Sequence, residues 1–135
     1  MSDSLQGSIL VDVETGDSGE FEASFLENVG HPVVLCHGPS EGSLCPLLAG
    51  QGCVKFDAAH GIVFELDLDR PQHRAIVEKY RKLAGADLPI KVVVRADQVE
   101  RYVDLLVDLE VWTKRPTVAD LDGFAAEVEA ADRFA

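Results

Sequence analysis

The sequence predicts a single α/β domain, spanning residues 1–135, in which a parallel sheet is covered by helices on both faces. Short apolar runs alternate with segments whose apolar residues recur at helical spacing, and the pattern repeats along the chain. The run GIVFELDL at 61–68 is almost continuously apolar, which is typical of a central strand buried on both faces. A chain of 135 residues with 47% hydrophobic residues is long enough to form one such core.

The first strand and helix are predicted between residues 8 and 30. The alternating run SILVDVE, residues 8–14, indicates a strand, and TGDSG is a turn. Asp17 and Glu20 then form a D-x-x-E capping pattern. Gly30 is expected to end the helix. The predicted buried face of this helix consists of Phe21, Phe25, Leu26 and Val29.

A second strand, an irregular segment and a second long helix follow. HPVVLCHGP at 31–39 indicates the strand, which Gly38 and Pro39 are expected to end. In the cysteine-containing segment at about 36–60, prolines and glycines interrupt any long helix, so a short helix and a loop are expected. Pro71 suits the first turn of the next helix. Gly85 is predicted to cap this helix. Its predicted buried stripe consists of Ile76, Val77, Tyr80, Leu83 and Ala84.

The last part of the chain contains two strands and two helices by the same criteria. PIKVVVRA at 89–96 and LEVWT at 109–113 are the strands. Asp97 and Glu100 form a capping box for the helix between them, and Thr117 with Asp120 begins the final helix. The apolar residues of these helices are Tyr102, Val103 and Leu106, then Val118, Leu121, Ala125 and Val128.

Charge and hydropathy narrow the functional classes. A formal charge of -12 with only 12 Lys and Arg residues argues against a nucleic-acid surface, and favours protein or cation partners. No apolar run approaches the roughly 18 to 20 residues that span a bilayer. The start MSDSLQGS has neither the basic nor the apolar region of a signal peptide, so no membrane association and a cytoplasmic location are expected.

Acidic and basic side chains are predicted to meet at one edge of the sheet, because the carboxyl ends of parallel strands share that edge. The residues concerned are Asp12 to Glu14, Asp67, Asp69, Arg95 and Lys114. Carboxylate oxygens suit a hard divalent cation, and a lysine can contact a phosphoryl oxygen. The alternative interpretation is that Asp67 and Asp69 are solvated residues before a helix, with Lys114 as their surface counter-ion.

These residues resemble the receiver domain of two-component response regulators over nearly the whole chain. ILVDVE is similar to the first receiver strand with its acidic end, and FLENVGHPVVLCHG to the first helix end and second strand. IVFELDLDRP resembles the third strand with its phospho-acceptor aspartate, and WTKRPTVADLDGFAAEV the fifth strand, Lys-Pro turn and last helix. The resemblance implies a flavodoxin-like, five-stranded parallel sheet of order 2-1-3-4-5 flanked by five helices.

The same resemblance implies roles for four residues. Asp67 matches the phosphorylated aspartate and a metal ligand, Glu14 one acid of the metal-binding pair, and Asp69 a carbonyl donor to Mg²⁺. Lys114 matches the lysine that contacts phosphate. The implied function is a stand-alone signalling domain, phosphorylated on Asp67 by a histidine kinase and acting on a downstream protein target.

Two departures from the family pattern point to an atypical or pseudo-receiver that works without phosphorylation. Val13 stands where the family has the other metal-binding acid, so Mg²⁺ binding is expected to be weakened unless Asp12 turns inward to replace it. Arg95 stands where the family usually has a Thr or Ser that closes onto the phosphoryl group. We expect Arg95 to pair permanently with Asp67, lower the pKa of that acid and compete with metal. The alternative is that Arg95 is an exposed strand-end side chain.

Two further interpretations remain open at this point. Cys36, Cys45 and Cys53, with His37, could bind Zn²⁺ or iron or sense redox state, although the cysteines lack a tight C-x2-4-C spacing and buried cysteine is often only a small apolar residue. An enzyme is the least favoured reading, because no nucleophile and base pair and no Gly-rich phosphate loop are visible. In the receiver family, the face of the fourth helix, fifth strand and last helix forms protein contacts, which makes a homodimer through that face one option.

Overall fold

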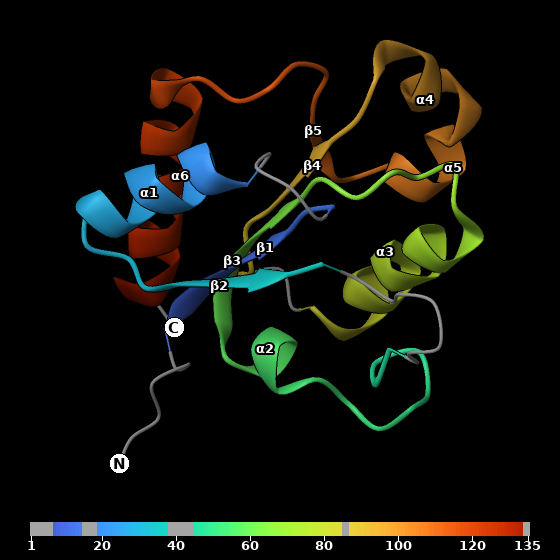
Figure 1. The fold of residues 1–135 in the computed structure, drawn as a ribbon, viewed down its shortest axis with the longest axis horizontal. Coiled ribbons are helices and arrows are strands. Elements are labelled where there is room, and N and C mark those ends of the chain that lie inside the picture. Colours follow the sequence, from blue (N-terminus) through green and yellow to red (C-terminus); the bar gives the residue numbers. More distant parts are fainter. Residues whose placement is uncertain (1–6, 15–18, 38–44, 85–86, 134–135) are drawn as a thin grey trace.

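The computed structural model describes residues 7–14, 19–37, 45–84 and 87–133, and it contains one parallel sheet of order β2-β1-β3-β4-β5 (Figure 1). This confirms the predicted sheet and strand order. The strands are β1 Ser8–Asp12, β2 Val33–Cys36, β3 Ala59–Phe64, β4 Ile90–Val93 and β5 Glu110–Trp112. The helices are α1 Glu20–Asn28, α2 Val54–Asp57, α3 Pro71–Leu83, α4 Ala96–Arg101, α5 Val103–Leu106 and α6 Val118–Arg133.

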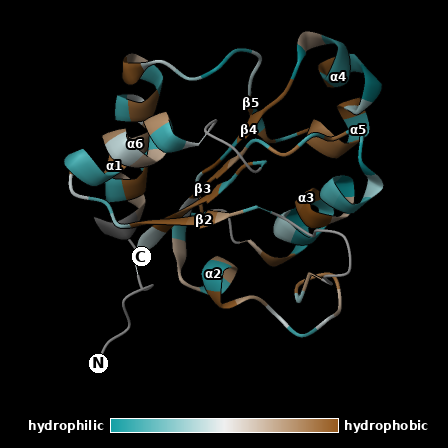
Figure 2. Ribbon diagram, viewed as in Figure 1, coloured by the Kyte–Doolittle hydropathy of each residue, from teal (hydrophilic) through white to brown (hydrophobic). Residues whose placement is uncertain are grey.

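Two apolar cores lie on the two faces of the sheet, because successive residues of a strand point in opposite directions. Leu10 and Phe64 face the layer that contains α3 and α5, and α3 contributes Tyr80 to that core. Val11 and Val63 face the opposite layer, where α1 and α6 pack together. The apolar strands between partly polar helices are visible in Figure 2. None of the helices in the described part of the chain is long and apolar enough to cross a membrane.

The third strand ends earlier than its apolar sequence predicts. β3 ends at Phe64, whereas the predicted strand continues to Leu68. Its neighbours end at nearly the same level: Phe64 pairs with Asp12, the last residue of β1, and with Val92, one residue before the end of β4. Leu68 is still fully buried, although it lies outside the ladder. Asp67 therefore lies in the loop after β3.

The predicted fourth helix is interrupted. α4 and α5 are separated at Tyr102, whose backbone angles of φ -118° and ψ 35° are not helical, so the described residues contain six helical elements rather than the five predicted. The predicted Asp97 and Glu100 capping box is also wrong, because the N-cap of α4 is Arg95, two residues before Asp97. Gln98 instead accepts a hydrogen bond from the Arg95 N–H through Oε1, at 3.1 Å.

The first helix buries a different face from the one predicted. Leu26 is buried, but Phe21 and Val29 are each 42% exposed, and Glu22 is fully buried instead. Leu83 and Val118, predicted to be buried in their helices, are also mainly exposed. The reciprocal hydrogen bonds between Thr117 and Asp120 confirm the start predicted for the last helix. The predicted roles of Asp17, Gly38, Pro39 and Gly85 lie outside the described residues.

Gly61 provides a direct test of how β3 packs on α6. A Cβ atom at Gly61 would lie 2.6 Å from Val128 Cγ2 and 2.9 Å from Phe124 Cζ, so an Ala there must displace packed side chains. We expect Gly61→Ala to lower the free energy of unfolding by about 1–3 kcal/mol in urea denaturation. Gly123→Ala is the matched control: its Cβ meets no atom within 4 Å, and it should raise the stability of α6 by about 0.5–1 kcal/mol. Equal effects of the two substitutions would contradict this packing.

Candidate functional site

A cleft of about 470 Å³ lies at the carboxyl ends of the strands. Four of the predicted site residues line it: Glu14, Asp67, Arg95 and Lys114. They come from the segments after β1, β3, β4 and β5, so the parallel topology brings together residues that are far apart in the sequence. The other polar residues of the wall are Glu65, Arg70, Gln98, Thr113 and Arg115.

The carboxylate of Asp67 is oriented by its neighbours and is accessible. Its Oδ1 accepts hydrogen bonds from the Asp69 N–H at 3.0 Å and from Gln98 Nε2 at 2.9 Å. Arg95 Nη1 lies 3.7 Å from the same oxygen, at the long limit of an ion pair. The side chain of Asp67 is 40% exposed. This acid therefore has a fixed orientation at the cleft surface.

The backbone of Asp67 is fixed from the other side of the loop. Its N–H donates to Glu14 Oε2 at 3.2 Å, so the acid after β1 is used partly to position this loop. His73 is buried, and its Nδ1 lies 2.7 Å from the Asp67 carbonyl oxygen. Since a carbonyl oxygen only accepts hydrogen bonds, Nδ1 must carry the proton. His73 was not anticipated from the sequence, because a single histidine on a helix gives no distinctive pattern.

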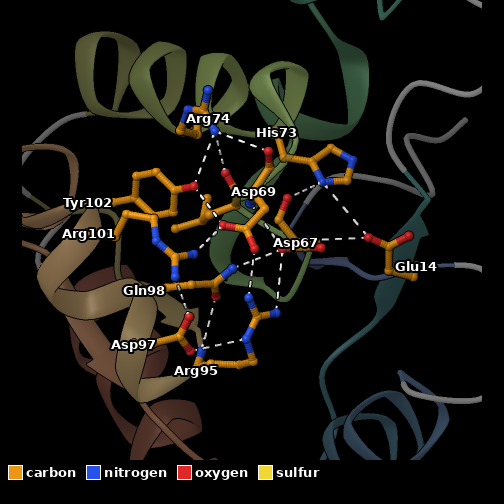
Figure 3. A network of polar contacts seen from close by, with 11 residues as sticks. Glu14, Asp67, Asp69, His73, Arg74, Arg95, Asp97, Gln98, Arg101 and Tyr102 are labelled. Carbon is orange, nitrogen blue, oxygen red and sulfur yellow. Dashed lines mark hydrogen bonds and ion pairs between the residues drawn. The ribbon is translucent and has the colours of Figure 1, made fainter.

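Asp69 is the centre of a polar network between the β3–α3 loop and α4 (Figure 3). Arg95 Nη2 lies 2.7 Å from Asp69 Oδ2, while Arg101 Nη1 at 2.7 Å and the Tyr102 hydroxyl at 2.6 Å both donate to Oδ1. Asp97 pairs with the same two arginines, at 3.2 Å from Arg95 and 2.8 Å from Arg101. We call Asp69, Arg95, Asp97, Arg101 and Tyr102 the α4 clasp.

The clasp changes the protonation equilibrium of its central acid. Hydrogen bonds from Tyr102 first, and then from Arg95, lower the pKa of Asp69 well below its usual range. Arg74 adds to the same contact from α3: its guanidinium lies 5.2 Å from the centre of the Tyr102 ring and donates to the Leu68 carbonyl at 2.9 Å. Asp69 consequently stays ionised into acid pH, and its carboxylate is bound by groups of α4 and Tyr102.

The architecture closely matches solved receiver structures. A CheY-like response regulator receiver domain protein from Methanospirillum hungatei superimposes with a TM-score of 0.64 and 15% identity, covering 96% of this chain and 99% of that one. The C-terminus of E. coli RcsC, which contains a linker region and a phosphoreceiver domain, gives 0.67 and 12%, covering 99% of this chain and 50% of that one. The chain has a receiver-like fold.

A response regulator protein from Burkholderia multivorans agrees with this result, with a TM-score of 0.61 and 15% identity over 90% of this chain and 94% of that one. No protein-family model matches the sequence, and no curated protein matches it either. At these identities the similarity concerns the receiver fold, and the site has to be judged from the residues of this chain.

The acidic residues do not form the complete metal-binding set that the receiver resemblance implies. Val13 is 1% exposed and belongs to the core against α1 and α6. Asp12 is also buried, and its Oδ2 accepts a hydrogen bond from the Tyr80 hydroxyl of α3 at 2.7 Å, so it does not replace the missing acid at the cleft. The carboxylate of Asp69 is held in the clasp, and its backbone carbonyl, the predicted metal donor, accepts a hydrogen bond from Arg74 Nη1 at 3.2 Å. Of the predicted ligands, Glu14 and Asp67 are the two that line the cleft.

Asp12 is part of the core rather than of the surface chemistry. Burial raises its pKa from 3.8 to about 7, against the opposing effect of hydrogen bonds from Tyr80 and Cys36. Cys36, Cys45 and Cys53 are half-buried and pack against the same core as Tyr80. Among the described residues, no three His, Cys, Asp or Glu side chains form a group that could bind a metal. The structure gives no support to the alternative zinc or iron site.

Arg95 lies at the cleft, as predicted, but its main partner differs from the predicted one. The guanidinium is 3.7 Å from Asp67 and 2.7 Å from Asp69. The stronger contact of Arg95 is thus with Asp69, and Asp67 receives a weaker contact from the same guanidinium.

The ring of His37, which was predicted as a possible metal ligand, lies close to the backbone after β1. Its Nδ1 is 3.1 Å from the Val13 carbonyl oxygen.

A pair of acids, the fully buried Glu22 and the half-buried Glu65, lies beside the cleft and was not anticipated from the sequence. Glu22 is fully buried on α1, and Glu65 lines the cleft wall. The pKa of Glu65 is raised from 4.5 to about 9. The largest cause is burial, followed by the hydrogen bond and the charge of Glu22, while the charge of Arg115 opposes the shift. Neither oxygen of Glu22 has a hydrogen-bond donor among the described residues unless Glu65 carries a proton. The pair therefore holds a proton at neutral pH.

This protonated pair should make the stability of the protein depend on pH. Since the pKa of Glu65 is higher in the folded state, the folded state binds the proton more tightly, and stability falls as pH rises from about 4.5 to about 9. In Glu65→Gln the amide supplies the donor at every pH, so thermal melting should show a smaller loss of Tm over this range. Glu20→Gln, an exposed change on α1, is the control and should keep the wild-type slope. Parallel pH profiles for wild type and Glu65→Gln would contradict a shared proton.

The clasp predicts a second titration result. Tyr102→Phe removes the hydroxyl that is the largest cause of the low pKa of Asp69, so that pKa should rise toward its ordinary value of 3.8. Carboxyl carbon NMR shifts followed through acid pH measure the change directly. The wild-type protein, titrated under the same conditions, is the control. An unchanged pKa for Asp69 in Tyr102→Phe would show that the hydroxyl does not contact this acid in solution.

Proposed function

We propose that this protein is a receiver-like signalling domain that acts through protein contacts and does not require phosphorylation. The observation that carries the proposal is the position of Arg95. In the receiver family, a Thr or Ser at this place closes onto the phosphoryl group, but the guanidinium of Arg95 contacts Asp69 at 2.7 Å without one. The contact between Arg95 at the start of α4 and Asp69 in the loop after β3 therefore forms without phosphorylation of Asp67.

The cleft chemistry supports the same proposal. Phosphoryl transfer to a carboxylate requires positive charge to neutralise the transferred group. Of the acids that the resemblance assigns to Mg²⁺, Glu14 and Asp67 are at the cleft, while Val13 supplies no oxygen. We infer that Mg²⁺ binds weakly here. Arg95 adds a fixed positive charge at 3.7 Å from Asp67, which disfavours a cation at the same carboxylate.

The competing candidate is an active receiver, phosphorylated on Asp67 by a histidine kinase. It is favoured by one specific observation: the accessible carboxylate of Asp67 and the Lys114 side chain line the same cleft. In that case Lys114 would contact the phosphoryl oxygens and Arg95 would have to leave Asp69 or share it. A cytoplasmic location and a homodimer through α4, α5, β5 and α6 stay predictions under both candidates.

A phosphodonor assay separates these two candidates. Wild-type protein is incubated with Mg²⁺ and acetyl phosphate, and its intact mass is then measured. We expect no mass increase, because the metal set is incomplete and Arg95 occupies the switch position. Arg95→Thr is the informative variant, since it restores a hydroxyl and should increase any slow phosphorylation. A mass increase of one phosphoryl group in wild type that disappears in Asp67→Ala would establish the active receiver and refute our proposal.

A further inference from the structure

A second cleft, of about 680 Å³, lies at the opposite end of the sheet from Asp67. Its lining comes from the C-terminal part of α3, the segments that lead into β4 and β5, and the last turns of α6. Figure 1 shows where these elements lie in the fold. The residues that line it are Arg81, Ala84, Asp87, Leu88, Pro89, Ile90, Asp108, Leu109, Glu110, Glu127, Ala130 and Ala131. Neither the receiver resemblance nor the function proposed above uses this end of the molecule.

The lining of this second cleft combines an apolar surface with acidic groups. The apolar part comes from the starts of β4 and β5 and from α6, and includes Leu88, Ile90 and Leu109. Four carboxylates accompany a single cationic residue, Arg81. Arg81 is already used within the fold, because its Nη1 donates to the carbonyl oxygens of Asp104 and Leu105 at 3.1 and 2.7 Å. The cleft therefore presents excess negative charge next to apolar surface.

Two of these carboxylates are fixed in place from beneath. Lys91 has a side chain only 4% exposed, and its Nζ lies 2.5 Å from Glu110 Oε1 and 2.8 Å from Glu127 Oε2. The two glutamates themselves are 68% and 46% exposed. Each carboxylate has about four acceptor positions, so pairing with one ammonium leaves capacity toward solvent. A buried lysine thus aligns two accessible acids, one from β5 and one from α6.

We propose that this cleft docks a basic segment of a partner protein that carries arginine between aliphatic residues. An arginine places its aliphatic stem on apolar surface while its guanidinium donates to carboxylates in a bidentate manner. The lining fits this chemistry because Leu88 and Leu109 lie beside four acids. A nucleic acid or another anionic ligand is repelled by the same charges, and the proposal is independent of the phosphorylation state of Asp67.

The test uses the whole protein and a defined probe. The peptide acetyl-Leu-Arg-Ile-Arg-Leu-amide is titrated into labelled protein, and backbone amide NMR shifts are followed. We expect shifts at Ile90, Leu109 and Ala130 that saturate and weaken with added salt. The same peptide with glutamate in place of arginine should cause none of them. Absence of shifts with the arginine peptide at millimolar concentration would overturn the proposal.

Two pairs of substitutions with equal charge change locate the binding site. Asp87→Asn with Asp108→Asn removes two acids of the cleft and leaves the pairs of Lys91 intact. Asn suits position 108, where φ is 71°, because Asn adopts positive φ more readily than most residues. Each exposed ion pair between a peptide arginine and one of these acids is worth about 0.2–1 kcal/mol. Loss of two such pairs should lower the affinity for the peptide roughly two- to thirtyfold.

The control pair is Asp57→Asn with Asp122→Asn, two exposed acids outside the cleft lining. It should keep the wild-type affinity. An equal loss in both pairs would show that the peptide responds to the overall charge of -12 rather than to this cleft. Concentration-dependent shifts of the same residues without peptide would identify a second copy of the chain as the occupant and would also overturn the proposal.

Discussion

The contact between Asp69 and α4 is the interaction on which the state of the cleft depends. One carboxylate receives Arg95, Arg101 and the Tyr102 hydroxyl, all within 2.7 Å. Three consequences follow from this convergence. The loop after β3 is fixed to the start of α4, Arg95 is kept beside Asp67, and Asp69 is not available as an independent ligand. Single exposed ion pairs contribute little to stability. The clasp therefore acts mainly by orienting the side chains around Asp69, because several hydrogen bonds converge on its one carboxylate.

The surroundings of the clasp use buried acids in two different ways. Asp12, on the α3 side of the sheet, is stabilised by the Tyr80 hydroxyl, which supplies a donor from within the core. Glu65 and Glu22, on the α1 side, need a proton to form a hydrogen bond with each other. The pKa values of Asp12 and Glu65 are both raised, because burial disfavours the charged form of a carboxyl group. The receiver-like sheet therefore carries titratable acids inside as well as at its edge, and the inner acids couple the stability of the fold to pH.

Periodicity predicted the alternation of strands and helices, and the receiver resemblance implied the strand order. The rule for parallel strand ends predicted the meeting of Glu14, Asp67, Arg95 and Lys114, because it depends on topology alone. The sequence could not predict where β3 ends, because that depends on the length of its neighbours. The preference of Arg95 for the second acid of the loop depends on side-chain geometry across α4. Burial of Glu22 had no local signal, since a glutamate in the first turn of a helix is usually exposed.

Hydrogen exchange of the α4 amides tests the clasp most directly. Exchange rates of residues 96–101 are measured in wild type with and without Mg²⁺ and acetyl phosphate, and in Arg95→Ala. If the clasp fixes α4 without a phosphoryl group, wild-type α4 is protected, the phosphodonor does not change that protection, and Arg95→Ala exchanges faster while β1 and β3 do not. Protection of α4 that rises in wild type when the phosphodonor is added, or that is unchanged in Arg95→Ala, would contradict the account.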